Sequence, residues 1–396
     1  MTLRTIDLFC GAGGLSQGFR QAGFDVRLGV DLDEDAVATY RRNQRGAKAL
    51  VADLKKVSAA DLLAEAEVDE VEVVLGGPSC QGFSTHGRRN GWVRPDDSRN
   101  FLYREYARIV EELQPLCFVM ENVPGLLYYD NGRFWEKIKR RFVRAGYRVR
   151  HELLLAADYG IPQLRRRLLI VGTRLDDPFV FPERTHVGAL RRDHRELWEK
   201  RRLARWPHLD AHVGVWDAIS DLPPIDAGGG TDVARFGGPA QTEFQRRLRA
   251  GSRSLYDHQA ASLSEGHLRQ IEHVPEGGTW RDIPLELLPK RFARIRRTDS
   301  TTLFGRLERA FPAYTITTQF NNVTTGCYTH PLQDRALSAR EGARIQTFPD
   351  RYRFVGSLES KCRQIGNAVP PLLAEVVAHA VAAHVGGAER RDRLVA

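Results

Sequence analysis

Cys80 stands in the segment GGPSCQGFS at 76–84, directly after the apolar run at 71–75. A lone cysteine is more often an inert core residue, but ligands and reactive groups collect at the carboxyl ends of parallel strands. We therefore expect Cys80 to act as a nucleophile. The polar stretch at 85–100, rich in Arg and Gly, predicts a lid that closes over an anionic substrate.

Two further motifs supply a carboxyl group and guanidinium groups. Glu121 ends the apolar run at 117–120; burial there could keep its carboxyl protonated near neutral pH, so that it donates to a ring nitrogen. Arg165 and Arg167 lie in QLRRR at 163–167, and their equal parity predicts that they face one side of an extended segment. The alternatives are a turn cap for Glu121 and an exposed strand start for the arginines.

The segment around Phe9 predicts a binding turn for a nucleoside. Its glycines are Gly11, Gly13 and Gly14. Glycine allows close backbone approach, and Phe9 could offer its ring to an adenine. Asp31 ends the next strand and suits a ribose diol, while Asp53 could accept from an adenine amino group. Because the turn lacks a phosphate-gripping fingerprint, it favours S-adenosylmethionine over NAD.

Alternating strands and helices must position these residues. Strands are expected at 5–9, 26–30, 71–75, 117–120, 147–155 and 167–173, and helices at 15–22, 34–43, 101–113 and 132–145. This alternation predicts an α/β fold with a mainly parallel sheet. The region from 182 to 334 has weak periodicity and predicts a second, irregular domain. Helices return at 338–347 and 371–384, and 386–396 is expected to fray.

Composition narrows the class of protein. Of 396 residues, 59 are Lys or Arg and 50 are Asp or Glu, which gives a formal charge of +9. Only eight of the basic residues are Lys, which favours a polyanionic partner or simply a GC-rich genome. No apolar stretch is long enough to predict a membrane span. The five scattered cysteines form no CxxC pair, so neither a metal site nor a disulfide framework is expected.

Taken in order, the motifs resemble those of the DNA cytosine-5 methyltransferases. The matching segments are DLFCGAGGLSQGF at 7–19, VDLDEDAVATY at 30–40, ADL at 52–54, GGPSCQGFS at 76–84, ENV at 121–123, QLRRR at 163–167, RxxxRxQxFP at 340–349 and GNAVPP at 366–371. Only about 185–310 lies outside them, where that family keeps its variable target-recognition region.

The resemblance implies a Rossmann-like catalytic domain at 1–184 and 356–396 and a target-recognition domain with a hinge segment at 185–355. It also implies roles for single residues. Cys80, Glu121, Arg165 and Arg167 are catalytic, Arg167 being the expected contact to the base. The cofactor S-adenosyl-L-methionine is held by Phe9, Gly11, Gly13, Gly14, Asp31, Asp53, Asn367 and Val369, and the helix around Arg340 and Arg344 organises the recognition domain.

The expected substrate is a specific duplex DNA sequence, methylated at C5 of a flipped-out cytosine. We expect a monomer on DNA in the bacterial cytoplasm, associated with the nucleoid, and a cognate restriction endonuclease encoded alongside. Two departures stand out: Ser79 replaces the usual Pro before the nucleophile, and Asp31 stands where Glu is common. The alternatives are an RNA or tRNA cytosine-5 methyltransferase, a catalytically silent DNA-binding regulator and a nicotinamide oxidoreductase.

Overall fold

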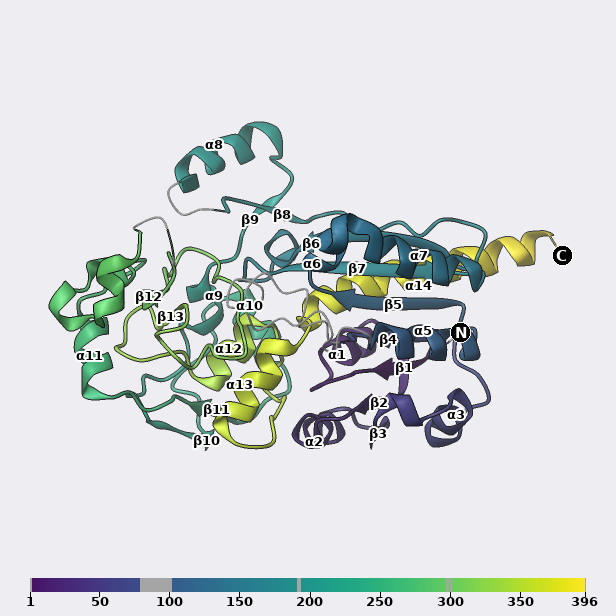
Figure 1. Ribbon diagram of the computed structural model, residues 1–396, viewed down its shortest axis with the longest axis horizontal. Coiled ribbons are helices and arrows are strands. Elements are labelled where there is room, and N and C mark those ends of the chain that lie inside the picture. Colours follow the sequence, from purple (N-terminus) through teal and green to yellow (C-terminus); the bar gives the residue numbers. More distant parts are fainter. Residues whose placement is uncertain (1, 79–101, 191–193, 297–298, 300, 396) are drawn as a thin grey trace. The chain divides into compact units, whose positions relative to one another are not determined.

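The chain forms two compact units in the computed structural model, which describes residues 2–78, 102–190, 194–296, 299 and 301–395 (Figure 1). The first unit consists of 1–155, 166–183 and 369–396, and the second of 156–165 and 184–368. Two segments expected in the catalytic domain, 156–165 and 356–368, therefore lie in the second unit. Helix α13 (Leu358–Asn367) packs there against helix α12 (Ala339–Ile345), a contact that sequence separation conceals.

A seven-stranded sheet runs through the first unit in the order β3-β2-β1-β4-β5-β7-β6. The strands are β1 (Arg4–Leu8), β2 (Asp25–Asp31), β3 (Lys48–Val51), β4 (Val73–Gly76), β5 (Cys117–Asn122), β6 (Arg148–Leu155) and β7 (Arg166–Thr173). Neighbouring strands are parallel except that β7 runs antiparallel to both β5 and β6. The predicted mainly parallel α/β fold is confirmed.

Helices cover the sheet because alternate strand residues point to opposite faces. The helices of this unit are α1 (Gly14–Gln21), α2 (Glu34–Asn43), α3 (Ala59–Ala66), α5 (Tyr103–Leu113), α6 (Gly125–Tyr128), α7 (Arg133–Arg144) and α14 (Pro371–Val395). Ile6 and Leu8 of β1 join a core built with α3, α5 and α7. The intervening Asp7 points to the other face, where its side chain meets α1 and α2.

Helices α1 and α14 join the two ends of the first unit. A Cβ placed on Gly18 of α1 would lie 2.4 Å from both the Ala374 side chain and the Pro371 carbonyl oxygen, so the two backbones approach too closely for any other residue. By length and composition alone, 358–387 could cross a membrane, but half of its most apolar window is buried. The backbone also leaves the helix at Ala368, between α13 and α14. We therefore interpret α14 as a core helix.

Short elements make up the second unit. They are β8 (His186–Val187), α8 (Arg195–Arg205), β9 (Asp210–Ala211), α9 (Val215–Ile219), β10 (Gly230–Ala234), α10 (Glu243–Arg249), β11 (Leu255–Gln259), α11 (Glu265–Glu272), β12 (Gly305–Arg306), β13 (Cys327–Thr329), α12 and α13. Strands β10 and β11 form an antiparallel pair. The predicted irregular character agrees with these short elements, whereas the helices inside the region escaped the sequence pattern.

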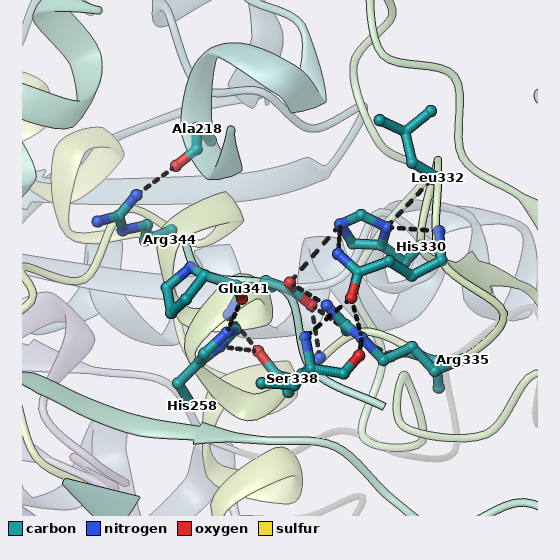
Figure 2. Close-up of polar contacts among 12 residues, drawn as sticks. Ala218, His258, His330, Leu332, Arg335, Ser338, Glu341 and Arg344 are labelled. Carbon is teal, nitrogen blue, oxygen red and sulfur yellow. Dashed lines mark hydrogen bonds and ion pairs between the residues drawn. The ribbon is translucent and has the colours of Figure 1, made fainter. Parts of the chain in front are cut away.

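Buried ion pairs hold this second unit together. Arg335 and Glu341 are both below 2% exposed and form two hydrogen bonds of 2.7 Å (Figure 2). Burial alone would raise the pKa of Glu341, but Arg335 lowers it well below its ordinary value. Arg344 of α12 reaches Asp350 at 2.7 Å, together with Asp221 and the Ala218 carbonyl oxygen. Helix α12 is thus fixed by charged side chains as well as by apolar packing.

Two elements depart from the expectations. Strand β3 was not predicted as a strand, because its four residues include Lys48 and lie partly exposed at the edge of the sheet. Helix α14 runs to Val395 instead of ending at His384. The polar residues expected to fray there are good helix formers, so the helix continues past the last core contacts.

Candidate active site

The turn after β1 has the geometry of a ligand-binding loop. Phe9, Gly11 and Gly13 all adopt positive φ angles of 57°, 52° and 85°. Gly13 caps α1, whose first residue is Gly14. A Cβ built on Gly11 would meet no atom within 4 Å, so open space lies beside this backbone. The left-handed conformation of Phe9, unusual for a bulky residue, turns the chain sharply at the sheet edge.

Asp31 closes this turn from the end of β2. Its two carboxylate oxygens accept hydrogen bonds from the Gly11 amide at 2.8 Å and the Asp33 amide at 3.0 Å. Burial raises the pKa of Asp31 above its ordinary value, and the backbone amides partly oppose that rise. An acidic side chain is therefore held by neutral dipoles next to the open space of the turn.

Asp7 is a member of this region that sequence reasoning missed. Its Oδ2 accepts a hydrogen bond of 2.6 Å from Ser16, whose hydroxyl also lies 2.9 Å from that of Tyr40. Within the described residues Oδ1 has no hydrogen-bond partner. Burial raises the pKa of Asp7 to about 7, against the hydrogen bond from Ser16. The alternation of β1 placed Asp7 opposite the core face, but nothing local indicated that the helices would bury it.

The remaining predicted cofactor residues lie at the ends of other elements. Asp53 accepts from the Lys55 amide and starts a short 3-10 turn after β3. It follows Ala52, whose amide donates to the Asp31 carbonyl oxygen at 3.0 Å, so Asp31 and Asp53 end neighbouring strands. Asn367 is the exposed last residue of α13 in the second unit, whereas Val369 is buried in the first. The structure thus gathers Phe9, the glycines, Asp31 and Asp53 in one unit.

Glu121 and Arg167 form an ion pair at the end of β5. The Arg167 Nε lies 2.6 Å from the Glu121 Oε1, and both side chains are nearly buried, at 13% and 12% exposed. Burial lowers the pKa of Arg167, and the Glu121 charge opposes this shift. The antiparallel direction of β7 creates the pair, because it brings the start of that strand beside the carboxyl end of β5.

The loop toward Cys80 lies against the same pair. A Cβ on Gly77 would stand 3.4 Å from the Glu121 Oε2, and the Asn122 side-chain amide donates to the Pro78 carbonyl oxygen at 3.2 Å. Asn122 thus links the two motifs, a role that the sequence did not suggest. Cys80 itself, Ser79 and the predicted lid at 85–100 lie outside the described residues. The other four cysteines are buried, as expected of packing residues.

Arg165 has a different placement from the one predicted. Its side chain is fully buried in the second unit, where Nη1 donates to the Ile316 carbonyl oxygen at 2.9 Å. Nη2 donates to the carbonyl oxygens of Gly366 and Ala368 at 2.8 and 3.0 Å. Local parity predicted that Arg165 shares one face with Arg167. Instead, distant backbone segments bind its terminal nitrogens, so the observed role of Arg165 is to join those segments.

Three motifs expected to act separately meet around Arg165. Gln163 donates to the Gln346 side chain at 2.8 Å, and Gln346 donates to the Ile365 carbonyl oxygen at 2.6 Å. A Cβ on Gly366 would lie 2.3 Å from the Thr317 carbonyl oxygen. The QLRRR, RxxxRxQxFP and GNAVPP motifs therefore converge through buried hydrogen bonds, and Gly366 permits the close approach.

Comparison with known proteins adds an independent finding. The family model of the C-5 cytosine-specific DNA methylases matches residues 3–383. The chain is 35% identical to the Type II methyltransferase M1.HphI of Haemophilus parahaemolyticus, with 96% of this chain and 87% of that protein covered. It is 34% identical to M.AgeI of Thalassovita gelatinovora, with coverages of 96% and 99%.

A solved structure shows the same architecture. It is that of a prophage-encoded E. coli protein assigned as a DNA modification methyltransferase, with a TM-score of 0.74, 26% identity, and 97% of this chain and 100% of that chain covered. The family match over nearly the whole chain, two relatives above 30% identity and the shared fold agree with one another. The chain therefore belongs to the C-5 cytosine-specific DNA methylases.

Proposed function

We propose that this DNA cytosine-5 methyltransferase transfers a methyl group from S-adenosylmethionine to C5 of a cytosine flipped out of a specific duplex sequence. The observation that carries the proposal is the Glu121–Arg167 ion pair beside the loop that leads to Cys80. A carboxyl group, a guanidinium group and a nearby thiol are the groups needed to activate a pyrimidine ring for substitution at C5.

The residues of the β1 turn fit the cofactor. Open space beside Gly11, the buried Asp31 carboxylate and the unpartnered Asp7 Oδ1 among the described residues suit a polar, positively charged nucleoside. Phe9 and the glycines would line it, Asp31 would bind the ribose and Asp53 the adenine, with Asn367 and Val369 completing the site. When bound, S-adenosylmethionine supplies an electrophilic methyl group.

The protein's own side chains prepare the cytosine. The Cys80 thiolate adds to C6, so that the C5–C6 double bond opens and its electrons make C5 nucleophilic. Glu121 holds N3 and the exocyclic amine and delivers a proton to N3 as charge develops there. After methylation, a base removes the C5 proton; C5–C6 re-forms and the Cys80 thiolate leaves. The step needs access to both faces of the ring, which a stacked base cannot give.

Arg167 can serve two partners at once. Its Nε pairs with Glu121 and its Nη1 donates to the Arg166 carbonyl oxygen at 2.8 Å. Within the described part of the chain, Nη2 has no partner and is available as a donor to the O2 of the base. The ion pair thus sets the orientation of both side chains before the cytosine arrives.

The alternatives predict different substrates. An RNA methyltransferase would act on RNA, and a silent regulator would bind DNA without turnover. The second unit, with 195 residues in its two segments (10 for 156–165 plus 185 for 184–368), favours a duplex reader over a short RNA-specific region. A restriction endonuclease encoded alongside would accompany the enzyme in a bacterial cytoplasm. Bisulfite sequencing of DNA from cells expressing the chain identifies the methylated motif directly.

Substitution of Cys80 tests the chemistry. We expect Cys80→Ala to abolish tritiated-methyl incorporation into duplex DNA while DNA binding persists. Cys327→Ala, which removes a buried cysteine from the second unit, should keep its activity. Duplex DNA containing 5-fluorocytosine should trap a covalent adduct with the wild-type chain only, because fluorine cannot leave as a proton. Full activity in Cys80→Ala would refute the mechanism.

A further inference from the structure

Helix α8 is the least buried helix for its charge in the second unit. None of its described side chains is buried, and Leu197 and Leu203 are 50% and 57% exposed. The helix lies in an excursion closed at its base by the parallel pairing of β8 and β9 and by the Asp210 amide, which donates to the Thr185 carbonyl oxygen at 3.0 Å. Packing therefore does not explain the sequence of this helix.

One face of α8 carries uncompensated positive charge. Arg201 and Arg205 are four residues apart, so they lie one above the other on a single face, and Lys200 adjoins them. All three side chains are exposed. On the other side, Glu199 is occupied by Arg202, whose Nε lies 3.0 Å from Oε2. Like charges one turn apart destabilise a helix, so an anionic partner would relieve this arrangement.

Aromatic rings fix the end of this face. The Trp198 and Trp206 rings stack with centroids 6.3 Å apart and an interplanar angle of 12°. The Arg205 guanidinium lies 5.1 Å from the centroid of the Trp206 ring. Arg202 donates to the Leu209 carbonyl oxygen at 2.6 Å and ties the helix end to the returning chain. The cations are therefore presented from a braced support, which lowers the entropy cost of binding.

We propose that α8 binds backbone phosphates of the duplex outside the methylated sequence, through Lys200, Arg201 and Arg205. The inference rests on the proposed duplex DNA substrate and adds a contact to it. A protein groove or a membrane surface would select a continuous apolar stripe. Leu197 and Leu203 are six residues apart and so point to well-separated sides of the helix, whereas the basic residues share one face. Charge complementarity therefore favours a polyanion.

The salt dependence of DNA binding tests this contact. The full chain, Arg201→Gln/Arg205→Gln and the control Lys137→Gln/Arg144→Gln, which removes two exposed charges from α7, would be titrated by fluorescence anisotropy with a random duplex of about 40 base pairs. Each lost phosphate contact reduces the slope of log affinity against log salt by about 0.9. Between 50 and 200 mM salt, the affinity of the α8 variant should fall about tenfold less than that of the wild type.

Further arms separate the possible outcomes. Arg201→Lys/Arg205→Lys should keep the wild-type slope, and all variants should keep wild-type methyl incorporation at low salt. A wild-type slope in the Gln variant would overturn the inference and leave the helix to a protein partner. An equal change in the control would overturn it too, since the effect would then be one of net charge. Failure of the wild type to methylate DNA would instead refute the proposed function.

Discussion

The two units bury carboxylates in opposite ways. In the first, Asp7 and Asp31 are met by a hydroxyl group and backbone amides, and burial raises both pKa values. In the second, Arg335 pairs with Glu341 and lowers its pKa. A carboxylate with an internal cation holds the fold, while one without it retains charge for a partner. The contrast therefore separates residues that hold the structure from residues that await a ligand.

The largest test breaks an internal pair. Arg344→Met should destabilise the chain by about 3–5 kcal/mol, because it leaves the carboxylates of Asp221 and Asp350 buried without their cation. Denaturant unfolding monitored by circular dichroism measures the change. Arg246→Met, on the exposed side of α10, serves as the control and should cost little. A loss below 1 kcal/mol in Arg344→Met would mean that these pairs do not hold the second unit.

A second test removes charge from the cofactor turn. Asp31→Asn keeps an oxygen that can accept from the Gly11 amide but loses the negative charge. We expect affinity for S-adenosylmethionine to fall by about 1.5–3 kcal/mol, with folding stability nearly unchanged. Isothermal titration calorimetry gives the affinity, and thermal unfolding without ligand gives the stability. Equal losses of both would place Asp31 among the structural carboxylates instead.

The smallest effect concerns Asp7 and pH. Its folded pKa of about 7 lies above that of an unfolded aspartate, so the protonated form favours folding. Its stabilising contribution is complete below the unfolded pKa and is lost as pH rises through 7. Between pH 5 and 8 the wild type should lose about 1–2 kcal/mol that Asp7→Asn does not lose.

Denaturant titrations of both proteins at the two pH values measure this difference. Asparagine can still accept from Ser16, so the hydrogen bond is matched. Parallel pH profiles for the two proteins would contradict the assignment, and would indicate that Asp31 or another buried acid controls the slope.

Local sequence signals predicted the residues at strand ends but not the partners that bury them. Glu121 follows an apolar run, and its position at the sheet edge was predictable. The burial of Arg165 was not, since its partners Ile316, Gly366 and Ala368 lie 151 to 203 residues away along the chain. Periodicity reports which face a residue occupies. It does not report which distant carbonyl groups will meet it there.

The same limit applies to Asp7 and to β3. Asp7 sits within the recognised DLF motif, yet its burial depends on helices that lie over the sheet. Strand β3 is short and partly exposed, and its pairing with β2 supplies the order that its own residues do not. Long-range hydrogen bonding, rather than local propensity, decided both outcomes.

The close packing of Gly18 against Ala374 has a consequence for biosynthesis. A ribosome releases the chain from its amino end, so α1 emerges about 350 residues before the helix that covers it. Until α14 is made, the apolar face of α1 has no permanent cover, while the second unit can already form. Completion of the first unit is thereby postponed to the last stage of translation.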